Sequence, residues 1–380
     1  MYRELGVYSD WVAAAGRGEG FPVARPGPET LRLVREALGC SAPEEYPRDV
    51  RLERRWERDG LEGEEVSWAV GYGPRTRAWV LKPAGAGAPL PGVLALHDHG
   101  DFKFYGKEKI ADGPEPPAAI MKAYRDAYYG GRAFANALAR AGFVVLVHDV
   151  FPWGSRKFPW ESLPEMVRQA AQALVRSVTV QPGDEEIALY NIATDLHEHI
   201  VEKYCGILGT TFAGVISYED RVAAAYLASR PDVISDRIGC IGLSGGGGRA
   251  ALLAATCDLL SAAVITGMMS TYGGLLDRHV STHTWMLFPA CWPRHGDWPD
   301  LAACRAPLPL LVQYDLDDEL FTVEGMRAAH ERLQTHYAGA GSPEAYTGEF
   351  YPGLHKFDLD MQRSAFAWLK ARLGMVAGSE

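Results

Sequence analysis

The chain lacks the features that mark several common protein classes. Its six cysteines include no C-x-x-C pair, so neither a zinc ribbon nor a dithiol redox motif is supported. No apolar run approaches the ~18 residues that a membrane-spanning helix needs, and the N-terminus has no apolar signal-peptide core. The formal net charge of −10 leaves no basic excess for nucleic acid or anionic membranes. We therefore expect a cytoplasmic globular protein that binds neither nucleic acid nor membranes. The sequence leaves open whether the protein forms a homo-oligomer.

Strand and helix patterns alternate along most of the 380 residues. Three strand-like segments come first, at 50–57, 65–70 and 76–81. Apolar strands are then expected at 91–97, 143–148, 237–243, 262–267 and 309–313, with a short one at 349–351. Helices are expected between and after them, at 131–141, 218–229, 246–257, 323–336 and 358–373. This alternation predicts an α/β fold with a mostly parallel central sheet and helices on both faces.

Two segments stand outside the alternation. Residues 1–45 are rich in glycine and proline, with one expected helix at 28–38, and are predicted to form an N-terminal extension. Residues 46–380 are predicted to form the catalytic domain. Within it, residues 151–210 hold two helical patterns, and we expect a cap-like insertion that shapes substrate access.

One glycine-rich stretch carries the clearest chemical signal. Gly242-Leu243-Ser244-Gly245-Gly246 fits the G-x-S-x-G nucleophile elbow, with a strand before it and a helix after it. At such a turn the serine takes strained backbone angles, and the residues two before and two after it come too close for side chains. The turn presents the hydroxyl of Ser244 to a cleft and aims the N–H of Gly245 at the same place. The pattern predicts a serine hydrolase.

A nucleophilic serine needs a base and an acid that orients the base. In folds that carry this elbow the chain order is serine, acid, histidine. His355 lies between the last expected strand and the last expected helix, which is where the base belongs. The acid should follow the strand at 309–313, where several carboxylates stand together. Asp318 is preferred, with Asp317 and then Asp315 behind it.

The oxyanion hole needs two backbone donors. The Gly245 N–H is the first, and the second is expected from the loop His97-Asp98-His99-Gly100-Asp101-Phe102. We predict the Asp101 N–H, with Phe102 second. Phe102, Trp153 and Trp285 are also predicted to line the substrate pocket, because they fall in loops and insertions near the expected mouth.

A metal-dependent alternative starts from the same loop. His97 to Asp101 match five of the six positions of the H-x-H-x-D-H metallohydrolase signature, but Phe102 occupies the sixth. His197-Glu198-His199 is expected to be a solvated helix face. Lys103, Lys107, Arg156 and Arg278 are expected to be surface charges. We therefore predict no metal site, and no phosphate cradle follows the elbow because Gly245 to Gly248 include no lysine.

Several motifs together resemble one superfamily. They are His97-Asp98-His99-Gly100, Tyr218-Glu219-Asp220, Ser229-Arg230-Pro231-Asp232-Val233, Arg237-Ile238-Gly239, the elbow, Leu311-Val312-Gln313 with Asp318-Glu319-Leu320-Phe321, and Gly353-Leu354-His355-Lys356-Phe357. From about residue 50 to 373 the chain resembles the α/β-hydrolases, and more narrowly the bacterial acetyl xylan esterases and dienelactone-hydrolase-like esterases.

The resemblance implies a carboxylesterase that cleaves a small or medium ester through an acyl-serine intermediate and needs no cofactor. The spacing of Val312-Gln313 to Asp318 and Leu320-Phe321 matches the pattern that holds the acid in these relatives, which implies Asp318. Three alternatives remain: a peptidase or amidase on the same triad, a biosynthetic acyl-transfer enzyme, and a non-hydrolytic scaffold protein. No propeller-like N-terminal domain supports the peptidase.

Overall fold

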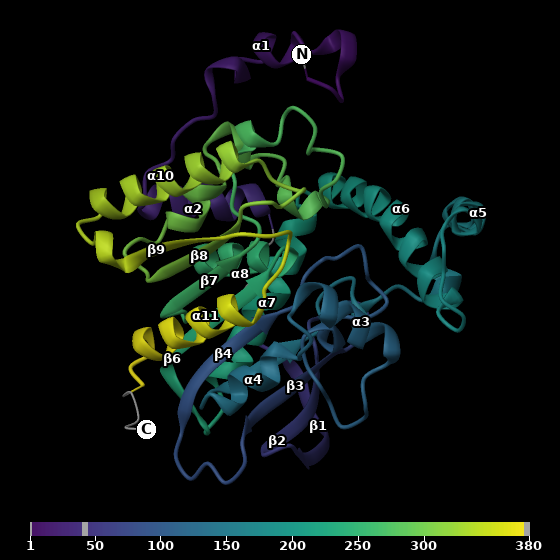
Figure 1. The fold of residues 1–380 in the computed structure, drawn as a ribbon, viewed down its shortest axis with the longest axis vertical. Helices are drawn as coiled ribbons and strands as arrows, with labels where there is room; N and C mark the ends of the chain where they lie inside the picture. Colours follow the sequence, from purple (N-terminus) through teal and green to yellow (C-terminus); the bar gives the residue numbers. More distant parts are fainter. Residues whose placement is uncertain (1, 40–44, 376–380) are drawn as a thin grey trace.

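The computed structural model describes residues 2–39 and 45–375. Its sheet has nine strands in the order β1-β2-β3-β5-β4-β6-β7-β8-β9 (Figure 1). β1, β2, β3 and β5 pair antiparallel, and every pair from β5 to β9 is parallel. The strands are β1 (Arg48–Arg58), β2 (Leu61–Ala69), β3 (Thr76–Pro83), β4 (Leu90–Leu96), β5 (Val144–His148), β6 (Val233–Leu243), β7 (Ala262–Thr266), β8 (Leu310–Asp315) and β9 (Tyr346–Tyr351).

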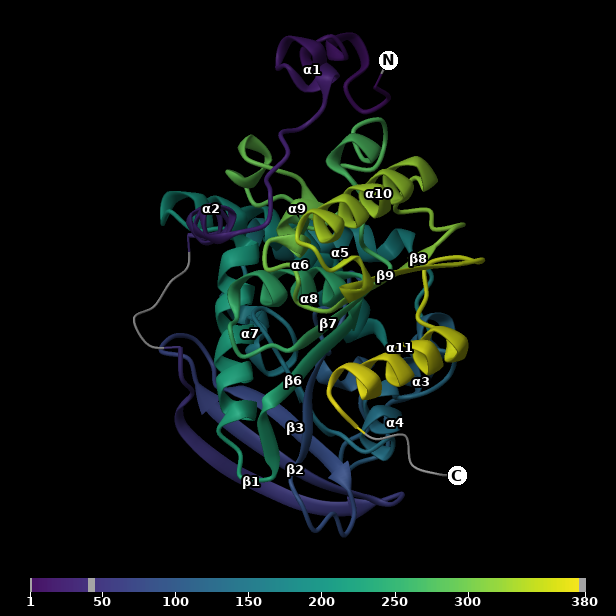
Figure 2. The same ribbon diagram turned by 90° about the vertical axis from the view of Figure 1, so that its left-hand side faces the viewer.

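Helices cover both faces of this sheet (Figure 2). On one face, α4 (Phe134–Arg140) and α11 (Leu359–Arg372) share an apolar core with the strands. The opposite face packs on a second core formed by α2 (Pro28–Leu38), α7 (Phe212–Ala228), α8 (Gly245–Thr256), α9 (Trp298–Ala303) and α10 (Val323–Gly339). The predicted mostly parallel sheet with helices on both faces is confirmed.

The burial of the strands follows their apolar patterns. All five residues of β5 are buried, as are all five of β7, because both faces of these central strands are covered. β1 lies at the sheet edge and is almost wholly exposed, and its sequence is correspondingly rich in arginine and glutamate. The apolar parallel strands therefore form the rigid centre, and their carboxyl ends point toward the loops that carry the predicted site residues.

Parts of the two segments outside the alternation lie at the periphery. α5 (Glu165–Leu174) and α6 (Glu185–Ile207) pack on one another through a small apolar cluster and project beside the sheet (Figure 1). α1 (Trp11–Ala14) lies at the far end of the molecule from the antiparallel strands. The predicted extension 1–45 and catalytic domain 46–380 include residues 1, 40–44 and 376–380, which lie outside the described residues. Within the described ranges, no helix is both long and apolar enough to cross a membrane.

Candidate active site

Ser244 lies at a tight turn between β6 and α8. Its backbone angles are φ 56° and ψ −122°, which place a non-glycine residue in a strained region. A Cβ on Gly242 would stand 2.4 Å from the backbone of Gly246, and a Cβ on Gly246 would stand 2.2 Å from the Leu96 carbonyl oxygen. Both glycines are therefore required by close backbone contacts, as the elbow pattern predicts.

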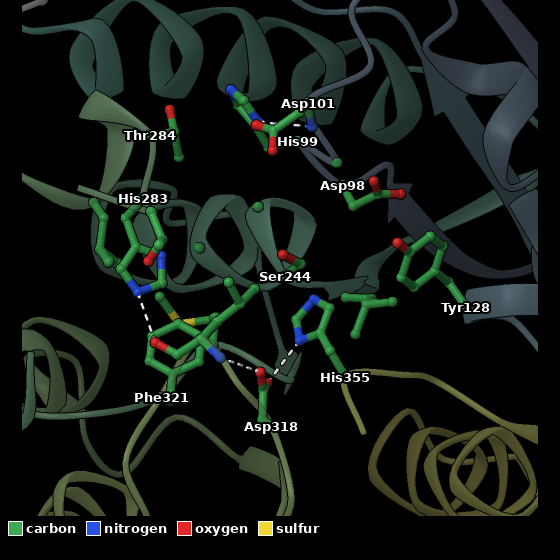
Figure 3. Close-up of a pocket in the computed structure, with 18 of the residues that line it drawn as sticks. Asp98, His99, Asp101, Tyr128, Ser244, His283, Thr284, Asp318, Phe321 and His355 are labelled. Atoms are coloured by element: carbon green, nitrogen blue, oxygen red, sulfur yellow. Dashed lines mark hydrogen bonds and ion pairs between the residues drawn. The ribbon is translucent and has the colours of Figure 1, made fainter. Parts of the chain in front are cut away.

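His355 and Asp318 meet beside this serine. The Nδ1 of His355 lies 2.7 Å from the Asp318 carboxylate, and the other carboxylate oxygen accepts the Leu320 N–H at 2.8 Å. Figure 3 shows the His355 ring between Asp318 and Ser244. Burial disfavours the charged ring, but the hydrogen bond and charge of Asp318 outweigh it, so the pKa of His355 is raised. With its Nδ1 proton donated to Asp318, the ring can offer its Nε2 lone pair toward Ser244.

The other two candidate acids accept hydrogen bonds from backbone N–H groups. Asp317 is exposed and accepts the Gly353 N–H at 2.7 Å. Asp315 is buried at the end of β8 and accepts the Lys356 N–H at 3.1 Å. Burial raises the pKa of Asp315 to about 7. Of the three candidates, Asp318 is the one that orients the histidine in this structure.

The predicted second oxyanion donors are directed elsewhere. Asp101 has φ 47°, and this turn points its N–H at Nδ1 of the preceding His99 ring, 3.2 Å away. The Phe102 N–H donates to the His99 carbonyl at 3.2 Å. The prediction of Asp101, with Phe102 behind it, is therefore corrected. The backbone nitrogen of His99 lies beside the elbow, 2.6 Å from the place a Cβ on Gly245 would occupy.

A cavity of about 510 Å³ opens over Ser244 and His355. Its described lining includes no lysine or arginine. It comprises Asp98, His99, Gly100, Asp101, Tyr124, Ala127, Tyr128, Leu243, Ser244, Gly245, Gly248, Met268, Thr282, His283, Thr284, Met286, Leu287, Trp298, Asp318, Glu319, Leu320, Phe321, Leu354 and His355. A cavity of this size holds a small ester with both its acyl and alcohol parts.

Comparisons with known proteins agree with this architecture. No protein-family model matches the chain. "Putative hydrolase YtaP" of Bacillus subtilis (strain 168) is 23% identical over 305 residues, which cover 80% of this chain and 86% of that protein. A "putative acetyl xylan esterase" from Bacteroides fragilis superposes with a TM-score of 0.63 at 17% identity, covering 85% of this chain and 74% of that one. The chain has the α/β-hydrolase fold. A glucuronoyl esterase from Solibacter usitatus superposes with a TM-score of 0.62 at 15% identity, covering 91% of this chain and 92% of that one.

Within this α/β-hydrolase fold, the three predicted substrate-binding aromatics do not line the cavity. Trp153 is buried behind the loop after β4, where it contacts the rings of His97 and His99 edge-on or tilted. Phe102 stacks on Tyr105, and Trp285 donates its ring N–H to His199 at 2.8 Å. These roles are corrected, because clustering in sequence did not reveal which side of each loop faces the cavity.

The cavity wall instead contains residues that the sequence did not single out. Tyr124 and Tyr128 come from α3 (Ala119–Tyr128), a helix that was not predicted. His283 donates from Nε2 to the Leu320 carbonyl at 3.0 Å, and burial lowers the pKa of His283 to about 4. A carbonyl oxygen can only accept, so the neutral His283 ring keeps Nδ1 as an acceptor.

A buried charge cluster supports the loop after β4. Glu198 of α6 is only 4% exposed and lies 2.8 Å from Nε2 of His99 and 2.7 Å from Nζ of Lys103. Its other oxygen accepts the hydroxyl of Thr284 and the N–H of Trp285. Burial alone would raise the pKa of Glu198, but the charges of Lys103 and His99 hold it well below its usual value.

The expectation of a solvated face at 197–199 is therefore wrong for His197 and Glu198, both of which are buried. Lys103, Lys107 and Arg156 are buried as well, each paired with a carboxylate. The fully buried partners, Glu198, Asp149 and Glu219, lie 42 or more positions away in the chain, so no local pattern identifies these pairs. Two of these long-range ion pairs join the insertion to the loop after β4 and to α7.

The residues of the metal signature are bound within the protein. Nδ1 of His97 contacts the Asp98 carbonyl at 3.1 Å, and both ring nitrogens of His99 face protein groups. Among the residues that the structure describes, the donor atoms close enough to share an ion belong to Asp315, Asp318 and His355. None of these three residues comes from the loop after β4.

Proposed function

We propose that the protein is a serine carboxylic ester hydrolase that cleaves small or medium esters through an acyl-serine intermediate. The observation that carries the proposal is the 2.7 Å contact of His355 with Asp318 beside a serine in elbow geometry. The names of similar proteins add support, since two solved structures with this fold are described as esterases and the curated relative as a hydrolase.

The chemistry follows from the positions of the three side chains. Nε2 of His355 takes the hydroxyl proton as Oγ of Ser244 attacks the ester carbonyl carbon. The carbonyl oxygen becomes an oxyanion held by the N–H of Gly245, the first residue of α8, where the helix dipole also favours negative charge. The carbonyl then re-forms, the bond to the alcohol oxygen breaks, and His355 returns the proton to that oxygen. Water repeats the sequence on the acyl-enzyme.

The charge of the cavity favours neutral substrates. Its described wall has no lysine or arginine, and the exposed carboxylates of Asp101 and Glu319 lie at its edge. A free carboxylate or phosphate on the substrate would meet like charge here without a compensating partner. Neutral short-chain esters, acetyl esters among them, fit this wall best.

The decisive experiment compares the wild type with Ser244→Ala on short p-nitrophenyl esters. Loss of the nucleophile should lower kcat by at least ~10⁴-fold, and a fluorophosphonate probe should label Ser244 in the wild type alone. Ser229→Ala, at the end of α7 and away from the cavity, is the matched control and should keep full activity. Undiminished turnover by Ser244→Ala would refute the proposal. Comparing anilides with esters separates an amidase from an esterase.

The domain limits belong to the same proposal. We infer that residues 151–210 act as a cap-like insertion on the catalytic domain 46–380, and that residues 1–45 form an extension. The reach of Glu198 from α6 to the loop after β4 supports a role for the insertion at the site. A cytoplasmic location, the need for no cofactor and the absence of nucleic-acid or membrane partners remain predictions from the sequence.

A further inference from the structure

We propose that Lys109 is a positioning residue that aims the backbone N–H of His99 toward Ser244, as the second oxyanion donor. The inference rests on the proposed ester hydrolysis. It concerns a buried lysine that touches neither Ser244 nor the cavity.

Lys109 is fully buried in the short 3-10 turn Lys107–Lys109. Its ammonium group donates to the Asp98 carbonyl at 2.9 Å and to the His99 carbonyl at 2.8 Å. The third acceptor is the Asp98 carboxylate, 3.4 Å away. Burial lowers the pKa of Lys109 to about 8, although the Asp98 charge opposes that effect. The lysine is thus a cation at neutral pH, with one acceptor for each of its three donors.

The geometry of the peptide bond links the hydrogen bond at the Asp98 carbonyl to the direction of the His99 N–H. In a planar trans peptide the C=O and the following N–H point in opposite directions. Because Lys109 holds the Asp98 carbonyl, the His99 N–H must point away from the lysine.

The elbow lies on that other side. A Cβ on Gly245 would stand 2.6 Å from the His99 nitrogen. Across residues 2–39 and 45–375, no protein acceptor is bonded to the His99 N–H. The N–H groups of Gly245 and His99 therefore both lie beside Ser244, and neither has a protein acceptor among the described residues.

The Asp98 carbonyl has few other restraints. Besides Lys109, it is contacted only by Nδ1 of the neighbouring His97 ring, at 3.1 Å, among the described residues. The His99 carbonyl, by contrast, also receives the Phe102 N–H and the Trp153 ring N–H. Without the ammonium group, the Asp98–His99 peptide can rotate. It would then present its carbonyl to the developing oxyanion in place of its N–H.

The test compares Lys109→Met with Lys107→Met. Lys107 is the matched control, since it is also buried in the same turn but pairs with Asp149 and Glu108 side chains instead of loop carbonyls. For Lys109→Met we expect kcat on a short p-nitrophenyl ester to fall on the order of 100-fold, as for loss of one oxyanion donor, with KM changed by less than about threefold. Labelling by a fluorophosphonate should slow by a similar factor. Lys107→Met should keep kcat per folded molecule within about threefold.

A double variant distinguishes the loss of the positioning contact from misfolding caused by an unpaired buried carboxylate. Lys109→Met combined with Asp98→Asn removes the unpaired buried carboxylate but still leaves the Asp98 carbonyl without its donor, so the same loss of kcat is expected. Equal kcat in Lys109→Met and Lys107→Met, or a loss confined to KM, would overturn the positioning role. If the wild type neither hydrolyses the ester nor reacts with the probe, the proposed function falls, and the role of Lys109 falls with it.

Discussion

Asp315 gives the site a second carboxyl group that should tune the pH at which His355 becomes a base. It is buried, and burial raises its pKa to about 7. One of its carboxylate oxygens lies within 4.8 Å of a carboxylate oxygen of Asp318 and of a ring nitrogen of His355. The Asp315 carboxylate favours the charged ring of His355 and contributes to the raised pKa of that residue. Asp315→Asn should therefore lower the pKa of His355 and move the acid limb of kcat/KM to lower pH.

The size of the shift follows from Coulomb's law. Two unit charges 4.8 Å apart interact by ~0.9 kcal/mol in water and by ~1.7 kcal/mol at an effective dielectric constant of about 40. These energies correspond to a displacement of the limb by roughly 0.6 to 1.3 pH units.

Stability should respond to the same substitution. The pKa of Asp315 is higher in the fold than its ordinary value of 3.8, so the protein is most stable below about pH 4 with respect to this group. That contribution, at most roughly 4 kcal/mol, is lost as the pH rises through about 7. The amide cannot ionise, so Asp315→Asn should narrow the difference in Tm between about pH 5 and about pH 8.

The assay is a pH profile of kcat/KM on a neutral ester, together with melting curves at both pH values. Asp317→Asn is the control, because it removes the same charge from the same loop at an exposed position. It should move neither the limb nor the Tm difference appreciably. An acid limb for Asp315→Asn within about 0.2 pH units of the wild type, with parallel melting behaviour, would refute the reasoning.

Three further substitutions test other parts of the site. Asp318→Asn should lower kcat by roughly 10³- to 10⁴-fold without unfolding, because the amide no longer favours the productive tautomer of His355; near-normal turnover would contradict this. Glu198→Gln removes the buried carboxylate that pairs with Lys103 and His99, and should lower the free energy of unfolding in urea by about 2 to 4 kcal/mol. A change below about 0.5 kcal/mol would show the pair to be dispensable. Gly246→Ala should cost roughly 3 kcal/mol or more, since its Cβ would stand 2.2 Å from a β4 carbonyl oxygen; a wild-type Tm would contradict the close contact.

The parts of the site that the sequence predicts are those specified locally. The elbow is visible because its five residues are contiguous in the chain, and a Cβ on Gly242 would meet the backbone of Gly246 only four residues later. The positions of Asp318 and His355 follow from chain order, since each comes directly after a recognisable strand. Parallel strands bring their following loops to one edge of the sheet, so order along the chain becomes proximity in space.

Other features depend on packing between distant segments. Glu198 and Lys103 are ordinary surface residue types, and only the docking of α6 against the loop after β4 buries them together. The direction of the Asp101 N–H depends on a single left-handed turn that its residue type does not require. Tyr128 reaches the cavity from α3, a helix that the sequence analysis did not predict. Side-chain direction and long-range pairing carry no periodic signal, so these features emerged only in three dimensions.

The buried carboxylate of Glu198 also limits how the protein can be recombined. A chimera that replaced residues 151–210 with the insertion of a relative would bring a new helix against the loop after β4. Unless that helix supplied an acid at the same place, Lys103 would keep its charge in a closed interior, at a cost of about 3 to 5 kcal/mol. The insertion and the loop are therefore interchangeable only as a matched set, and substitutions at these positions should be coupled in any engineered or naturally diverged version of the chain.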